Sequence, residues 1–166
     1  MKVNDNIDNA GPTDQFQPSV AAGPGGAVAV AFYDRRAPCP TDASIVAAHV
    51  GRVNFCIDTT VQAFTDHGAG AVKVGHNARL SAFTWDPEQP AQTIDGLDQM
   101  ACAAHQNPCQ TRSFIGDYFG LAVSATSVYG LFVSTQYPSS VSGDQGTPVY
   151  YQPQVLANAP RSALGV

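Results

Sequence analysis

The chain has 166 residues, enough for one domain with a core but too few for two large domains. Hydrophobic residues make up 44% of it, which excludes a disordered tail, and charged residues only 13%, which disfavours long exposed helices. A formal net charge of -5 argues against nucleic acid or an anionic membrane as a partner, and no apolar run approaches the ~20 residues of a membrane span.

The first third of the chain predicts short strands joined by turns. Residues 1–13 are polar and predict a flexible lead-in, and residues 16–22 predict the first strand. Gly23-Pro24-Gly25-Gly26 is a strong turn signal, after which residues 27–33 predict a second strand with Val28, Val30 and Phe32 on one face. Residues 45–50 and 53–57 predict a hairpin around Gly51-Arg52.

The rest of the chain is less regular until residue 115. One strand is predicted at 79–85, followed by a long polar surface excursion that continues to residue 113. Further strands are predicted at 115–124, 129–137 and 149–156, and residues 158–166 are expected to form a loose tail. The prediction is an all-β chain with one domain over 14–157, made of units at 14–113 and 114–157.

Four cysteines indicate an oxidising compartment, and therefore a secreted or extracytoplasmic protein. Four cysteines allow three pairings; the pairing that we expect is Cys102 with Cys109, closing a small loop, and Cys39 with Cys56. Cys102, His105 and Cys109 also have short spacings that zinc accepts, but a fourth ligand is not evident. The prediction is a disulfide-stapled insertion without a metal.

An internal repeat links the two units. A shift of 103 residues aligns Asp14 with Asp117, Phe16 with Phe119 and Val30 with Val133 without a gap, among other matches. Repeated four-stranded units are typical of β-propellers, in which each blade buries its faces against its neighbours. At roughly 40–50 residues per blade, the chain would hold about two antiparallel four-stranded blades.

Two segments carry a family resemblance: DQFQPSVAAGPGGAVAVAFYDRR at 14–36 and FIGDYFGLAVSATSVYGLFVST at 114–135. Each resembles the opening strand pair of a blade in bacterial sialidase-like β-propellers, the BNR or Asp-box repeat proteins. The family's Asp box, Ser-x-Asp-x-Gly-x-Thr-Trp, is only partly matched at residues 142–148. Its Ser, Asp and Gly are present at the right spacing, but its Thr and Trp are missing, because Thr147-Pro148 follows directly. An ordinary tight turn would use the same residues.

The resemblance implies an exo-sialidase type of glycoside hydrolase, whose chemistry needs an arginine cluster, an acid/base Asp and a Tyr nucleophile assisted by Glu. The catalytic set is incomplete here, because Glu88 is the only glutamate and the family's Arg-Ile-Pro motif is absent. The candidate substrate-binding residues are Asp34, Arg35, Arg36, Asp117 and Tyr118. The alternative is structural: strand-end ion pairs for the first three, and backbone capping for Asp117.

Two functions follow from these observations. The first is a sialidase-like propeller segment of a secreted, carbohydrate-active protein that is not catalytically complete by itself. The second is a non-catalytic propeller module that binds a glycan, glycoprotein or protein at its rim. No cofactor is expected, apart from Asp117 as a candidate calcium ligand, and apolar blade faces predict self-association or the remaining blades of a larger propeller.

Overall fold

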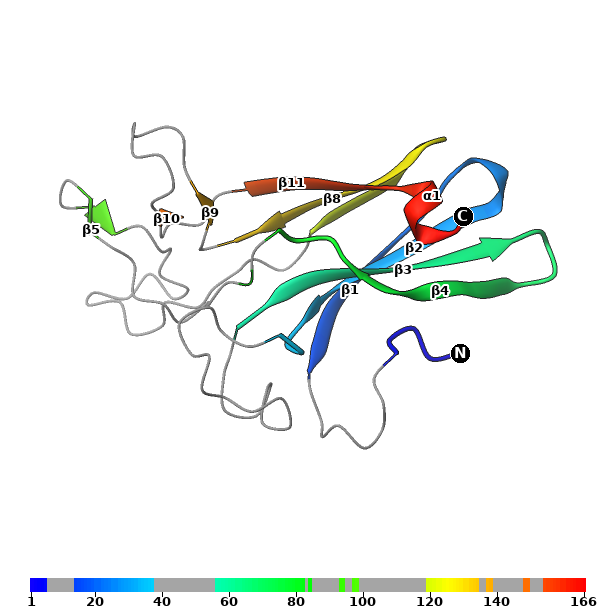
Figure 1. Cartoon of the computed structure of the whole chain (residues 1–166), viewed down its shortest axis with the longest axis horizontal. Coiled ribbons are helices and arrows are strands. Elements are labelled where there is room, and N and C mark those ends of the chain that lie inside the picture. The colour runs from blue at the N-terminus through cyan, green and yellow to red at the C-terminus, as the bar shows by residue number, and fades with distance from the viewer. Residues whose placement is uncertain are drawn as a thin grey trace.

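A computed structural model describes residues 1–5, 14–37, 56–82, 84, 119–134 and 154–166, together with four two-residue strands (Figure 1). The described part is built almost entirely from β-strands, which form two antiparallel sheets of four and three strands. The predicted all-β class is therefore confirmed. The two-residue strands pair with each other as β5 with β6 and β9 with β10; their bounds are Thr93–Ile94, Leu97–Asp98, Tyr137–Pro138 and Pro148–Val149.

The larger sheet has its strands in chain order, β1-β2-β3-β4, each antiparallel to the next. Its strands are Gln15–Ala22, Ala27–Asp34, Asp58–Asp66 and Ala71–Arg79. The predicted strands at 16–22 and 27–33 are confirmed as β1 and β2, and the predicted turn between them contains the 3-10 turn Pro24–Gly26. The predicted hairpin around Gly51-Arg52 lies outside the described residues, apart from Cys56 and Ile57.

The smaller sheet has the order β11-β8-β7, with strands Gly120–Val123, Ser127–Val133 and Gln154–Pro160. Helix α1, Arg161–Leu164, follows β11 directly, and Leu164 is buried in the core. Residues 158–166 are thus not a loose tail, because they complete β11 and form α1. None of the helices in the described part of the chain has the length and apolar character to cross a membrane.

Small side chains let the two sheets pack closely. Ala29 and Ala31 of β2 pair with Ala63 and Val61 of β3, and this face packs against Val128 of the smaller sheet. The larger residues Val28 and Val30 point to the opposite face, so alternation along β2 separates a small inner face from a bulkier outer face. Gly23 also lies against Val123, so close that a Cβ atom on it would be 2.5 Å from Cγ1.

Tyr33 joins the two sheets at the other part of the core. Its ring packs between Phe16 and Phe119, with centroid separations of 5.5 Å and 5.1 Å, and its hydroxyl accepts the N–H of Val133 at 3.4 Å. Burial raises the pKa of Tyr33, and the hydrogen bond from the Val133 N–H opposes that shift without cancelling it. The phenol therefore acts as a neutral structural contact at ordinary pH.

The region from 58 to 85 differs most from expectation. The predicted strand at 79–85 is wrong, because β4 ends at Arg79 and residues 80–82 and 84 have no strand conformation. Strands β3 and β4, which occupy 58–79, were not predicted. The first seven residues of β3 are all buried, and they include Thr and Gln as well as apolar residues. The strand therefore lacks the alternation of apolar and polar residues that marks a half-buried strand in a sequence.

The strand pairing does not preserve the predicted gap-free repeat. Val20 pairs with Val30, so a 103-residue shift would pair Val123 with Val133, whereas Val123 pairs with Val128. The two hairpins differ because their turns differ in length. Both segments form a hairpin whose second strand is mostly buried. A shared hairpin does not by itself establish a propeller blade, so the blade interpretation stays a prediction.

Cys56 lies two residues before β3, is fully buried and is disulfide-bonded. Cys39, Cys102 and Cys109 lie outside the described residues, so the pairings Cys39–Cys56 and Cys102–Cys109 stay predictions. The same holds for the stapled insertion.

Candidate functional site

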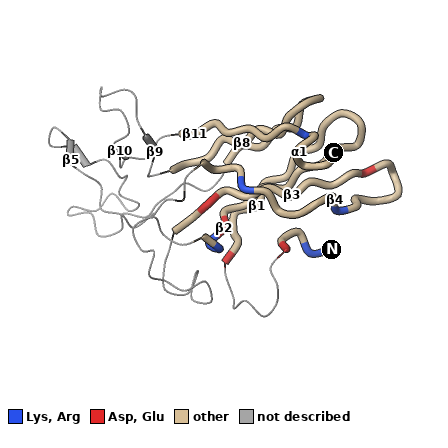
Figure 2. The backbone as a smooth tube through the Cα atoms, viewed as in Figure 1, with Lys and Arg blue, Asp and Glu red and all other residues tan. Residues whose placement is uncertain are grey.

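A polar pocket lies at the end of the four-stranded sheet where β2 ends and β3 begins. Its volume is about 320 Å³. Its walls come from four parts of the chain, namely the N-terminal segment, the end of β2, the start of β3 and the end of β4: Asp5, Asp34, Arg36, Ala37, Asp58, Thr60, Asn77 and Arg79. Figure 2 marks charged residues along the larger sheet and the N-terminal segment, whereas strands β7, β8 and β11 contain none. The pocket gathers five of the charged residues in the described part of the chain.

Two aspartates form the floor of this charged region. Asp34 ends β2 and Asp58 begins β3, and the two residues are direct partners across the ladder. Both are only 3% exposed. Two buried carboxylates opposite each other would repel strongly unless each had its own cationic partner.

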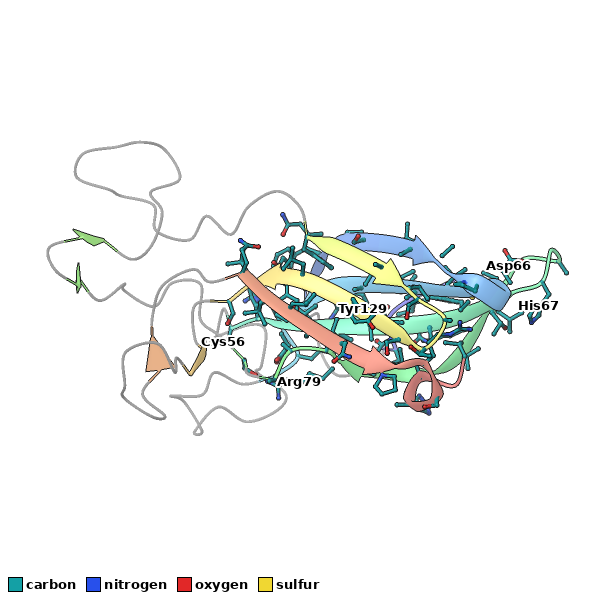
Figure 3. The ribbon with its side chains drawn as sticks, turned by 90° about the horizontal axis from the view of Figure 1, so that it is seen from above. Cys56, Asp66, His67, Arg79 and Tyr129 are labelled. Atoms are coloured by element: carbon teal, nitrogen blue, oxygen red, sulfur yellow. The ribbon has the colours of Figure 1, made fainter. Side chains whose placement is uncertain are left out.

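Asp58 has such a partner in Arg79, the last residue of β4. Nε of Arg79 donates to Oδ1 of Asp58 at 2.6 Å, and the hydroxyls of Ser81 and Thr84 donate to the same carboxylate at 2.8 Å each. Nη2 of Arg79 also donates to Thr84 at 2.9 Å. Figure 3 shows Arg79 at the same end of the molecule as Cys56, far from Asp66 and His67 in the β3–β4 turn.

Asp34 has its partner in Arg36, two residues further along the chain. Its Oδ1 accepts the Arg36 backbone N–H at 3.1 Å and Nε at 2.9 Å, and its Oδ2 lies 2.5 Å from Nη2. Nη1 of the same guanidinium binds Asp5 of the N-terminal segment. Burial by itself would lower the pKa of Arg36, but the hydrogen bonds and charges of Asp34 and Asp5 outweigh it and raise the pKa.

A bulge in β4 brings Asn77 into the pocket. Val61 pairs with Ala78 and Ala63 with Val74, so Gly75, His76 and Asn77 together face the single residue Gln62. Gly75 supplies the left-handed backbone of this bulge, with φ of 61°. The buried Gln62 side chain donates to the Val74 carbonyl at 2.7 Å and accepts Nδ2 of Asn77 at 2.6 Å, which fixes the Asn77 amide.

The arrangement suits binding better than proton transfer. Every oxygen of Asp34 and Asp58 already accepts at least one donor, so neither carboxylate is poised as a base. Arg79 keeps 46% of its side chain exposed, and among the described residues its Nη1 has no hydrogen-bond partner. A ligand in the pocket would thus meet one available guanidinium nitrogen and the Thr60 side chain, whereas the Asn77 amide is already bonded to Gln62, Val3, Asp5 and Arg36.

The net charge of the pocket does not favour the binding of anions. Three carboxylates and two guanidiniums line it, so its formal charge is negative. Within the described ranges, no group of three His, Cys, Asp or Glu side chains is arranged to hold a metal ion. Asp117, the candidate calcium ligand, lies outside those ranges.

The structure brings together two of the five predicted site residues. Asp34 and Arg36 line the pocket. Arg35 instead contacts Asp14, with Nη1 2.6 Å from Oδ2 and its backbone N–H on the Asp14 carbonyl, which matches the structural alternative. Asp117 and Tyr118 lie outside the described residues, so their roles stay predictions.

Sequence reasoning missed Asp5, Asp58, Asn77 and Arg79 as site residues. Asp58 had a weak signal, since it follows the mostly apolar stretch at 53–57 as a charged residue, as Asp34 follows the apolar residues 27–33. Asn77 gave no signal, because its position depends on a bulge that the sequence pattern does not show. Asp5 lay in a segment expected to be flexible.

Comparisons with known proteins add no assignment. A search against protein-family models gives no match, and searches of curated proteins and of solved structures give none either. The resemblance of residues 14–36 and 114–135 to sialidase-like propellers therefore stays a prediction from the sequence.

Proposed function

We propose that this chain is a non-catalytic sugar-binding β module of a secreted, carbohydrate-active protein. The observation that carries the proposal is the pocket at the end of the four-stranded sheet, in which two Asp–Arg pairs with buried carboxylates hold donors and acceptors in fixed positions. Sugars present closely spaced hydroxyls, each of which can both donate and accept, and a fixed polar array of this kind can match them.

Two further observations support the proposal. The strands of the larger sheet follow one another in chain order, which is also the order within a propeller blade. The resemblance to sialidase-like proteins points to the same class of ligand. The mixed charge of the pocket favours a neutral, hydroxyl-rich sugar, because each guanidinium is already neutralised by a carboxylate.

Binding is tested by screening the unaltered chain against immobilised neutral and acidic glycans, with the Arg79→Gln variant in parallel. We expect the unaltered chain to retain neutral sugars and the variant to lose at least about tenfold in affinity, the cost of one charge-assisted hydrogen bond. Arg35→Gln is the matched control, because Arg35 contacts Asp14 and does not line the pocket. Equal loss in both variants, or no retained glycan, would contradict the proposal.

The second candidate is a segment of a sialidase-type glycoside hydrolase. The described lining of the pocket contains Asp, Arg, Asn, Thr and Ala, but neither of the Tyr and Glu residues that this chemistry uses. We therefore expect no turnover of a fluorogenic sialoside by this chain alone. Turnover that Arg36→Ala abolishes would favour the hydrolase over the binding module.

A further inference from the structure

The N-terminal segment Met1–Asp5 contacts the sheet in the way that a bound peptide does. The backbone N–H of Asp5 donates to Oδ1 of Asn77 at 2.9 Å, and the Val3 carbonyl accepts Nδ2 of Asn77 at 3.3 Å. The Asn4 amide donates to Oε1 of Gln15 at 2.6 Å. Both backbone groups and side chains of the segment are thus recognised, with Figure 1 placing it beside β4.

Asp5 is the residue that the sheet holds most firmly. One carboxylate oxygen binds the Arg36 guanidinium, and the other accepts the backbone N–H of Asn77 at 2.9 Å. Hydrogen bonds between a carboxylate and a guanidinium or a backbone N–H are among the stronger ones in proteins. A side chain without a negative charge would lose both charge-assisted bonds.

The groups that receive the segment are held in place by the rest of the sheet. Asp34 orients Arg36 through Nε and Nη2, and Gln62 fixes the Asn77 amide from within the bulge. Neither contact involves the N-terminal segment. The site is therefore preorganised, which lowers the entropy cost of binding an extended chain.

The segment does not fill the space that it occupies. An apolar cavity of about 250 Å³ adjoins it, lined by Val3, Asn4, Gln15, Phe16, Pro18, Val30 and Phe32. The polar pocket lies on the other side, where Asp5 forms part of the wall. Because Val3 leaves the apolar cavity unfilled, a ligand with a larger apolar side chain at that position would bury more surface.

From this geometry we propose that the outer face of β1–β4 is a docking groove for an extended peptide of another protein, in which a large apolar residue precedes an aspartate by two positions. The chain's own segment Met1–Asp5 is an in-chain ligand that such a peptide displaces. The proposal does not rest on sugar binding, since the contacts that carry it are those of Arg36, Asn77 and Gln15 with a peptide.

Fluorescence polarisation with labelled, C-terminally amidated peptides tests this proposal on the full chain carrying Asp5→Asn, which weakens the in-chain ligand. The first probe is Met-Lys-Val-Asn-Asp. We expect it to bind at least about tenfold more tightly than the same peptide with Asn in place of its Asp. A peptide with Leu in place of Val should bind more tightly than the first probe, because Leu fills the apolar cavity.

Protein variants locate the binding. Arg36→Gln should remove the preference for the Asp peptide, whereas Arg35→Gln should keep it, with circular dichroism showing that each variant is folded. The unaltered chain should bind the Asp peptide more weakly than the Asp5→Asn chain, because its own segment competes. Equal binding of the Asp and Asn peptides, or an unchanged preference in folded Arg36→Gln, overturns the proposal, and neither result bears on the glycan screen.

Discussion

Asp58 shows how a single buried charge shapes the site. Its carboxylate accepts Arg79, Ser81 and Thr84, three donors that come from the end of β4 and the residues after it. These contacts direct the chain after β4 back across the sheet end, and Ser81 in turn accepts the backbone N–H of Thr59 at 2.9 Å. The residue therefore links the start of β3 to the exit from β4.

Replacing Asp58 by Asn should destabilise the protein by about 3 kcal/mol, because an amide cannot satisfy all three donors and Arg79 loses its counter-charge. The free energy of unfolding, measured in urea, checks this value. Asp14→Asn is the control, since Asp14 is largely exposed and its ion pair with Arg35 should contribute less than about 1 kcal/mol. Equal costs for the two variants would show that Asp58 is not a structural centre.

Acid should release the N-terminal segment. Burial of Asp5 would raise its pKa, but the Arg36 hydrogen bond, the Asn77 N–H and the Arg36 charge together hold the pKa below its ordinary value of 3.8. Stabilisation by Asp5 is therefore fully present above pH 3.8 and is lost as the pH falls through the lower, folded-state pKa. The difference in unfolding free energy between the unaltered chain and Asp5→Asn should shrink across this range, and a difference independent of pH would contradict the assignment.

At the scale of elements, the β1–β2 turn depends on close approach as well as on backbone freedom. Gly26 has φ of 74°, and a Cβ atom there would lie 2.1 Å from the carbonyl oxygen of Asp66. Gly68 also has a left-handed backbone, with φ of 91°, but nothing lies within 4 Å of its Cβ position. Substitution of Gly68 would thus measure the free-energy cost of a strained φ alone, whereas substitution of Gly26 would add the cost of a steric clash.

Gly68→Ala should cost about 1 kcal/mol, the strain of a left-handed alanine. Gly26→Ala should cost about 3 kcal/mol or more, because the turn must also move away from the end of β3. Thermal unfolding of both variants, compared with the unaltered chain, measures the difference. Similar melting temperatures for the two would mean that the β1–β2 and β3–β4 turns do not pack as described.

The sequence predicted some elements well and others poorly for physical reasons. Residues 15–34 carry alternation and a strong turn signal, so β1, β2 and their connection could be predicted. Strand β3 is buried on both faces and β4 contains the Gly75 bulge, so neither shows the period of two that a half-buried strand has. Of the site, Asp34 and Arg36 could be predicted from a strand end, but Asn77 and Asp5 meet only through that bulge.

In the molecule as a whole, the smaller sheet carries exposed apolar side chains on its outer face. Leu131 and Leu156 are direct partners on β8 and β11 and are 44% and 68% exposed, and Tyr129 lies on the same face (Figure 3). Val20 is exposed on the outer face of the larger sheet. Such faces are covered in propellers by neighbouring blades, and self-association or the presence of further blades stays a prediction.

Sedimentation measurements should therefore detect dimers or larger assemblies of this chain. Leu156→Glu should shift the chain toward the monomer, because it places a charge beside Leu131 on the exposed apolar face of the smaller sheet. Val72→Glu is the matched control, since Val72 is similarly exposed but belongs to β4 of the larger sheet and not to the face that Leu131 and Leu156 share. A monomeric unaltered chain at high concentration would contradict this account of the outer faces.

Sugar binding at the end of the four-stranded sheet is the property on which the proposed function depends. Backbone amide chemical shifts, recorded while neutral and acidic monosaccharides are titrated to millimolar concentration, test it most directly. We expect a neutral sugar to shift the amide signals of the residues that line the pocket, namely Arg36, Thr60, Asn77 and Arg79. Shifts centred on Tyr129 and Leu156 instead, or no shifts with any sugar, would contradict it.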